Sequence, residues 1–185
     1  MINIDKPTLT ALAREVAFIL AQKQRLAFAS DFHAFAEGRQ LTVAGVTFQN
    51  FFKGPETKRS DGDVVAHAIV MALAAALNKG DIEDWFPSDD GQTGVRSIEY
   101  LPEMRSRLIE PEHLLIGTID VTIICGEQPR MKKHVPEMQW NIAKGLGIDL
   151  SQVHVKVSSM DGHDEIARLE GIEARVLVSL WEGLK

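Results

Sequence analysis

The run VVAHAIVMALAAAL, residues 64–77, decides the fold more than any other stretch of the chain. Its pattern predicts a helix that is apolar on nearly every face, so the helix must be buried or covered by another subunit. Ser60 and Asp63 are three residues apart and resemble a capping pair at its start, while Asn78-Lys79-Gly80 is a plausible stop. We therefore expect other segments, from this chain or another subunit, to pack around this helix.

Strand patterns lie on both sides of this helix. They cover residues 25–35, 41–48 and 114–124, with further alternating runs around 153–157 and 174–180. We expect the first two strands to form a hairpin through the turn at Glu37-Gly38, and we expect residues 50–58 to be a loop. These segments predict one sheet.

Further helices are predicted over residues 8–24, 97–109 and 135–146, with a loop over 81–91. The interleaved order of strands and helices indicates an α/β fold, an α+β sandwich with helices packed on one sheet. A chain of 185 residues is long enough for one good core and short for two. We therefore expect one main domain.

Composition excludes several classes of partner. The net charge of -6 repels nucleic acid and anionic membranes, and no apolar stretch is long enough to span a bilayer. The single cysteine, Cys125, cannot form an internal disulfide, which fits a reducing compartment. We expect a cytoplasmic protein with no nucleic-acid and no membrane partner.

Three side chains form a candidate metal site. Asp31 and His33 share one face of the predicted strand because side chains alternate along it, and His67 lies on the long helix. One carboxylate and two imidazoles are the ligand set of a catalytic zinc with an open fourth position. Spacing alone leaves the alternative of an accidental polar trio. Asp63, one turn before His67, could orient that histidine or simply cap the helix.

Two segments could bind phosphate. Residues 60–63 open a helix whose backbone N-H groups attract anions, and Arg59 adds a permanent cation, although such an arginine can also merely solvate a loop. Residues 156–161 follow a strand and offer a lysine, hydroxyls and a carboxylate, which suit a phosphate and a hydrated Mg²⁺. Each signal is weak by itself.

Motifs recur in a fixed order between Asp31 and Ile172. They are Asp31-Phe32-His33, RSDGDVVAHA at 59–68, Gly80-Asp81-Ile82, Phe86-Pro87, DVTII at 120–124 and Pro129-Arg130-Met131. Together they resemble the 2-C-methyl-D-erythritol 2,4-cyclodiphosphate synthase family of the non-mevalonate isoprenoid pathway. The resemblance implies a mixed four-stranded sheet with a small hairpin, and a homotrimer with sites between subunits. It covers a domain of residues 25–185 and leaves residues 1–24 as an N-terminal helical extension.

The resemblance also assigns roles to residues. It makes Asp31, His33 and His67 ligands of Zn²⁺ or another divalent metal, and it places Mg²⁺ or Mn²⁺ at Asp161. Arg59 and Ser159 become catalytic. The substrate-binding set comprises Ser60, Asp63, Asp81, Ile82, Glu83, Phe86, Asp90, Pro129, Arg130, Met131, Ser158, Met160 and Arg168.

The chain departs from the family pattern in two ways. Conservative changes keep the charge type or the hydroxyl: Arg59 replaces His, Ser159 replaces Thr, Asp161 replaces Glu and Arg130 replaces Lys. Harsher changes alter shape and polarity: Ser30 and Glu165 replace Phe, and Glu83, Asp164 and Leu169 replace Gly. The lost aromatic residues border an axial channel that binds isoprenoid diphosphates in the family.

The resemblance implies a phosphorus-oxygen lyase. It would cyclise 4-diphosphocytidyl-2-C-methyl-D-erythritol 2-phosphate to 2-C-methyl-D-erythritol 2,4-cyclodiphosphate and release CMP. One alternative is a divergent trimeric zinc enzyme that acts on another phosphorylated or nucleotide-linked substrate, which Ser30, Glu83 and Glu165 favour. A second alternative is a non-catalytic metal-bound scaffold that binds a partner through the N-terminal helix.

Overall fold

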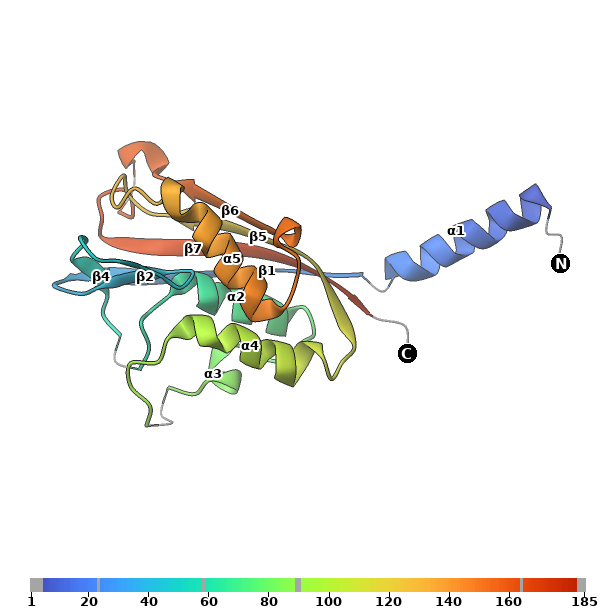
Figure 1. The fold of residues 1–185 in the computed structure, drawn as a ribbon, viewed down its shortest axis with the longest axis horizontal. Coiled ribbons are helices and arrows are strands. Elements are labelled where there is room, and N and C mark those ends of the chain that lie inside the picture. Colours follow the sequence, from blue (N-terminus) through green and yellow to red (C-terminus); the bar gives the residue numbers. More distant parts are fainter. Residues whose placement is uncertain (1–4, 23, 58, 89–90, 164, 183–185) are drawn as a thin grey trace.

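A computed structural model describes residues 5–22, 24–57, 59–88, 91–163 and 165–182 (Figure 1). Its main feature is a mixed sheet of five strands in the order β4-β1-β7-β5-β6. The strands are β1 (Gln24–Glu37), β4 (Lys53–Pro55), β5 (Leu114–Ile124), β6 (Val153–Ser158) and β7 (Gly171–Glu182). β5 and β6 are parallel, whereas β7 runs antiparallel to both β1 and β5. The sheet has five strands rather than four because β4 forms inside the stretch expected to be a loop.

A separate two-stranded hairpin consists of β2 (Leu41–Val43) and β3 (Val46–Phe48). The expectation of one strand here, paired with β1 through Glu37-Gly38, is wrong. Ala44 and Gly45 both have positive φ angles, 47° and 76°, which turn the chain back within the run. β1 pairs instead with β4 and β7.

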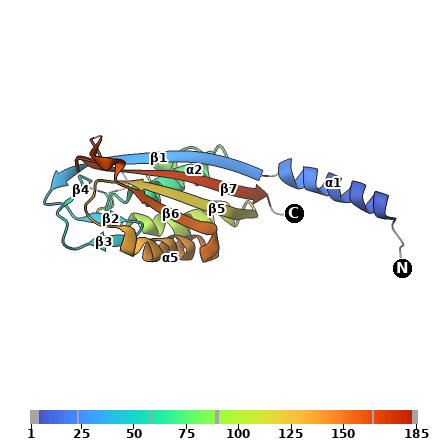
Figure 2. The ribbon, with the colours of Figure 1, turned by 90° about the horizontal axis from the view of Figure 1, so that it is seen from above.

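The helices α2 (Val64–Ala75), α4 (Tyr100–Met104) and α5 (Val135–Leu146) form a layer on one face of the sheet (Figures 1 and 2). A short helix, α3 (Ile82–Trp85), replaces part of the predicted loop. The other helical segments are η1 (Ser97–Glu99), η2 (Arg105–Ile109), η3 (Lys132–His134), η4 (Leu150–Gln152) and η5 (Met160–Gly162). The predicted helix over 97–109 is thus a succession of 3-10, α and π turns.

The core lies between the sheet and this helix layer. α2 packs against β1 and β7, and its apolar residues on almost every side are buried. The opposite face of the sheet carries exposed apolar side chains: Leu26, Phe28 and Phe32 on β1 are 63%, 61% and 50% exposed, and Leu177 on β7 is 45% exposed. We call these four residues the outward patch. Large exposed apolar patches are typical of interaction surfaces.

The N-terminal helix α1 (Lys6–Gln22) projects beyond the end of the sheet (Figures 1 and 2). Its large apolar residues Leu9, Leu12, Val16 and Ile19 are about half exposed. Within the described ranges, no helix has the length and apolar character needed to cross a membrane.

Candidate metal centre and substrate pocket

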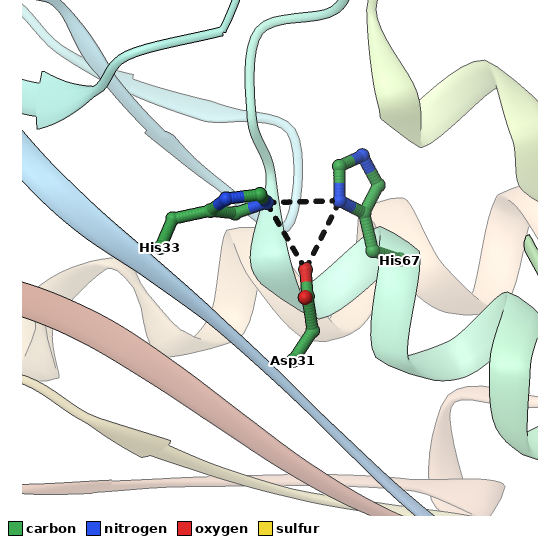
Figure 3. Close-up of side chains that lie close together, drawn as sticks. All are labelled: Asp31, His33 and His67. Carbon is green, nitrogen blue, oxygen red and sulfur yellow. Dashed lines mark hydrogen bonds and ion pairs between the residues drawn. The ribbon is translucent and has the colours of Figure 1, made fainter. Parts of the chain in front are cut away.

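Asp31, His33 and His67 converge on one point (Figure 3). The distance between His67 Nδ1 and Asp31 Oδ2 is 3.0 Å, that between His33 Nε2 and Asp31 Oδ2 is 3.2 Å, and that between His33 Nε2 and His67 Nδ1 is 3.2 Å. Donors bound at about 2.0–2.2 Å to one tetrahedral ion lie about 3.3–3.6 Å from each other, close to the spacing seen here. The three donors therefore fit a single divalent cation.

The backbone explains this convergence. Asp31 and His33 lie two residues apart on β1, so both point toward the helix layer, while Phe32 between them is exposed on the outward face. His67 is the fourth residue of α2, which packs against β1. The three side chains are partly buried, with exposed fractions of 20% for Asp31, 26% for His33 and 12% for His67.

The second ring nitrogen of His67 also has a partner. His67 Nε2 lies 2.9 Å from Ser97 Oγ, and Ser97 is fully buried. Ser97 is held in turn by Asp61, whose Oδ1 accepts a hydrogen bond of 3.0 Å from the Ser97 backbone N-H. Such a contact fixes the ring orientation of a metal-binding histidine. It leaves Nδ1 of His67 as the nitrogen that faces Asp31 and His33.

Asp31 is suited to remain ionised at this position. Burial raises the pKa of its carboxyl group, but hydrogen bonds and charge interactions with His33 and His67 outweigh burial and lower the pKa below its ordinary value. A carboxylate that stays deprotonated is available to a metal ion. The donor set, one hard oxygen and two imidazole nitrogens, suits zinc or a similar divalent cation.

The three donors line a pocket of about 480 Å³. Its wall also contains Thr57, Arg59, Ser60, Ile82, Glu83, Phe86, Ser88 and Tyr100. Eight of the residues named from the sequence therefore come together here: Asp31, His33, Arg59, Ser60, His67, Ile82, Glu83 and Phe86. A permanent cation, Arg59, and an aromatic wall lie in the same pocket as the metal donors.

The first N-H groups of α2, expected to attract an anion, are occupied by a side chain of the protein itself. Asp63 is the N-cap residue itself and is fully buried. Its carboxylate accepts hydrogen bonds from the backbone N-H groups of Val65 and Ala66, and also from those of Ala44 and Gly45. The interpretations of Asp63 as a substrate ligand and as the residue that orients the His67 ring are therefore wrong.

Ser60 and Gly62 shape the loop that leads into this cap. Ser60 Oγ accepts a hydrogen bond of 3.2 Å from Gly62 N-H, and Ser60 forms an isolated bridge with Val95. Gly62 has a φ of 68°, and a Cβ there would lie 2.5 Å from Pro55 Cβ. Only glycine fits this close approach.

The α3 segment contributes a second wall. Asp81 is the exposed N-cap of α3, and its side chain accepts from Glu83 N-H at 2.9 Å rather than lining the pocket. The Glu83 carboxylate accepts a hydrogen bond of 2.8 Å from Ser88 N-H. Phe86 is buried and stacks on Tyr100. Asp90 lies outside the described residues.

The residues expected to hold the nucleotide lie elsewhere. Pro129 and Arg130 line a separate pocket of about 420 Å³ with residues 47–51. Met131 is only 2% exposed and packs in the core, so its side chain does not line an open surface. Arg168 is exposed and pairs with Glu165 and Glu170.

Ser158 ends β6, and Ser159, Met160 and Asp161 follow it. Met160 and Asp161 have φ angles of 54° and 49°, and nearby Leu169, at one of the family's glycine positions, has a φ of 62°. The left-handed conformation is strained for such residues and is often found at functional sites. This loop and residues 129–130 together are called the nucleotide loops below.

The metal donors and the nucleotide loops lie at different places along the sheet. β1 and β6 are separated by β7 and β5, which corresponds to three strand spacings, about 14 Å. Both groups are near the same end of the sheet, because β1, β5 and β6 run in the same direction. Within one chain, the metal donors and residues 129–130 line separate pockets.

Sequence reasoning missed Ser97 and Tyr100. Ser97 contacts the metal-binding histidine, and Tyr100 contacts Arg59 and Phe86. A lone serine and a lone tyrosine carry no ligand pattern. Their spacing of three residues on a predicted helix, which places both on one face, is the only signal that could have found them.

The fold and the site together define a class: an α/β sandwich protein with a three-donor metal site open to a pocket. Residues 24–181 match the YgbB family. The chain belongs to this family, that of the 2-C-methyl-D-erythritol 2,4-cyclodiphosphate synthases. α1 lies outside the matched residues.

Relatives with that name align with this chain over nearly their whole length. The enzyme of Alkaliphilus metalliredigens is 36% identical over 164 residues, which are 86% of this chain and 99% of the relative. The enzyme of Clostridium perfringens is 37% identical over 157 residues, which are 84% of this chain and 98% of the relative.

Solved structures agree with the fold. The bifunctional IspDF of Campylobacter jejuni matches with a TM-score of 0.78 and 29% identity, over 86% of this chain and 42% of that chain. IspF of Plasmodium falciparum in complex with CDP matches with a TM-score of 0.73 and 26% identity, over 87% of this chain and 97% of that chain.

Proposed function

We propose that the protein converts 4-diphosphocytidyl-2-C-methyl-D-erythritol 2-phosphate to 2-C-methyl-D-erythritol 2,4-cyclodiphosphate and releases CMP in the cytoplasm. One observation carries the proposal: three metal donors, 3.0–3.2 Å apart, face a pocket that also contains Arg59. Family membership supports the same reaction, and the CDP bound to the Plasmodium falciparum relative supports a cytidine diphosphate group in the substrate.

The reaction is an intramolecular phosphoryl transfer. An oxygen of the 2-phosphate forms a bond to the β-phosphorus, and the bond from that phosphorus to the oxygen bridging the α-phosphorus breaks, so CMP leaves with the bridging oxygen. The nucleophile is already an anion, and the main requirements are a folded-back substrate and stabilisation of charge on the β-phosphate.

The residues of the pocket can meet these requirements. Asp31, His33 and His67 would hold zinc or another divalent cation, which when bound polarises phosphate oxygens as a Lewis acid. Arg59 lies in the same wall and can bind phosphate oxygens, and because its guanidinium does not deprotonate it acts by charge rather than as a proton donor. Buried Phe86 lines the pocket with an apolar ring that excludes water from one side.

The remaining roles belong to the nucleotide loops. Asp161 would hold Mg²⁺ or Mn²⁺ next to the diphosphate, and the Ser159 hydroxyl would bind a phosphate oxygen. Pro129 and Arg130 would contact the cytidine. These loops lie about 14 Å across the sheet from the donors of the same chain, which supports a site completed by the loops of a neighbouring subunit.

A homotrimer satisfies this geometry. The outward patch of Leu26, Phe28, Phe32 and Leu177 is an apolar surface that three copies of the sheet would bury around an axis. Each site would then lie between two subunits, with the metal donors from one and the nucleotide loops from the next.

Glu83 favours a second candidate function. Its carboxylate lies in the pocket wall, held by Ser88 N-H, and would repel a nearby phosphate. A related substrate with a hydroxyl or amine at this place would gain a partner instead. The second candidate is thus an enzyme of the same fold that acts on a different nucleotide-linked compound.

The decisive experiment measures CMP. The full chain with Zn²⁺ and Mg²⁺ is incubated with the cytidyl substrate, CMP is followed by chromatography and the cyclic product by phosphorus NMR. The unchanged protein and the control His154→Ala, which removes an exposed histidine on β6, should release CMP, and His67→Ala should not. Absence of CMP at stoichiometric, metal-loaded enzyme would contradict the proposal and favour the second candidate.

A further inference from the structure

Tyr100 touches both chemical groups of the pocket. It is the first residue of α4 and is 3% exposed. Its ring stacks on Phe86 with the centroids 4.0 Å apart, and it lies nearly parallel to the ring of His67 at 6.1 Å. Its hydroxyl accepts a hydrogen bond from Arg59 Nη1. One buried side chain therefore connects a metal donor with the cation of the pocket.

Arg59 needs such a partner to act with precision. An arginine side chain has several rotatable bonds, and holding it in one place costs rotamer entropy. The guanidinium carbon of Arg59 lies 5.5 Å from the centre of the Tyr100 ring, so Tyr100 holds the guanidinium close to its ring. The ring is itself fixed by the stack on Phe86 and His67.

The chemistry of this partner also matters. A carboxylate would orient an arginine but would cancel much of its charge. A phenol hydroxyl accepts a hydrogen bond while it stays neutral, so the contact with Tyr100 orients Arg59 without cancelling its positive charge.

We propose that Tyr100 is a positioning residue that fixes the guanidinium of Arg59 beside the metal donors, where it stabilises the phosphate that reacts. The inference rests on the proposed function, because that function makes Arg59 a phosphate ligand. It predicts that the hydroxyl of Tyr100 acts through Arg59 and not through the metal site.

Ser97 provides the matched comparison. It lies three residues before Tyr100, is equally buried and contacts His67 Nε2 at 2.9 Å. Removing its hydroxyl should disturb the metal donor, whereas removing that of Tyr100 should disturb the arginine. Loss of a hydrogen bond behind a metal ligand lowers metal affinity about 10- to 100-fold.

The test is a crossed set of variants: Tyr100→Phe, Ser97→Ala, Arg59→Met and the double variant Tyr100→Phe with Arg59→Met. Tyr100→Phe should lower kcat about tenfold, with KM changed by less than about threefold and zinc affinity by less than about twofold. In the Arg59→Met protein, adding Tyr100→Phe should lower the rate no further. This rate is measured in single turnover with excess enzyme. Ser97→Ala should weaken zinc binding instead. Thermal unfolding checks that Tyr100→Phe, which keeps the ring, remains folded.

Two results would overturn the inference. One is an equal loss of kcat from Tyr100→Phe whether or not Arg59 is present, because the two residues would then act independently. The other is a loss of zinc affinity as large as that of Ser97→Ala.

If the unchanged enzyme releases no CMP, the proposed function fails. The affinity for CDP of the zinc-loaded protein is then measured by calorimetry in the same set of variants. Tyr100→Phe should then weaken CDP binding only when Arg59 is present. No change in either background, or the same change in both, would refute the role of Tyr100 separately from the reaction.

Discussion

The metal half and the nucleotide half of the proposed site are built in opposite ways. The metal donors lie on β1 and α2, two elements of the core that pack on each other, and buried Ser97 supports one of them. The nucleotide loops follow the ends of β5 and β6 and include non-glycine residues with φ angles near 50°. The first half is preorganised within one chain, whereas the second is an exposed, strained edge.

The difference indicates that the two halves of the proposed site have different structural requirements. A metal ion tolerates errors of only a few tenths of an ångström in its ligands, which requires a rigid, buried support. A nucleotide can be held by loops that become ordered only when a second surface meets them. The predictions below test this division, beginning with the metal half.

The largest effect is expected from the metal half. His67→Ala removes one of three donors, so the remaining two should not retain zinc, and turnover should fall about 1,000-fold. Zinc content per chain, measured by elemental analysis after dialysis, and CMP release check this. A variant that keeps one tightly bound zinc per chain would show that the three side chains are not the ligand set.

The second effect tests whether a neighbouring chain completes the site. Phe28→Asp places a charge in the outward patch and should dissociate the proposed trimer, with turnover about 100-fold lower because the nucleotide loops lose their place. Light scattering gives the mass of the particle. Phe18→Asp on α1, an equally exposed phenylalanine, is the control and should leave mass and turnover unchanged. A monomer with full activity would mean that one chain makes the whole site.

The third effect belongs to the nucleotide half. Asp161→Asn removes the charge proposed to hold Mg²⁺, so the Mg²⁺ concentration for half-maximal turnover should rise about tenfold while zinc content stays the same. Titration of turnover with Mg²⁺ measures it. Asp149→Asn is the control, because asparagine still caps the turn at that position. An unchanged Mg²⁺ requirement in Asp161→Asn would remove Asp161 from the site.

The smallest effect is expected from the extension. Deletion of residues 1–22 removes α1, whose described side chains from Lys6 to Ile19 are exposed, so kcat and KM should change less than about twofold. Steady-state kinetics of the shortened chain checks this. A large loss would connect α1 with the site.

Much of the fold was predictable because its signals are local. The apolar runs of β5 and α2 define buried elements, and the spacing of Asp31 and His33 puts both on one side of a strand. The errors have physical causes as well. The Ala44-Gly45 turn uses a positive φ at an alanine, which composition does not reveal, and the short β4 and α3 form where charged and polar residues predicted a loop.

The candidate site was predictable only where residue type defines chemistry. Histidine and aspartate indicate possible metal binding. The carboxylate of Asp63, however, accepts hydrogen bonds from four backbone N-H groups that only the tertiary structure brings together. Ser97 and Tyr100 act by position rather than by type. Their contacts depend on how η1 and α4 pack against α2, and sequence spacing does not encode that packing.

The placement of α1 has a practical consequence. It joins β1 at Gln24, and His33 lies nine residues further along the same strand, about 30 Å away. α1 thus extends from the end of β1 that lies far from the metal donors, so a fluorescent reporter or an immobilisation tag fused ahead of it should leave the pocket unobstructed.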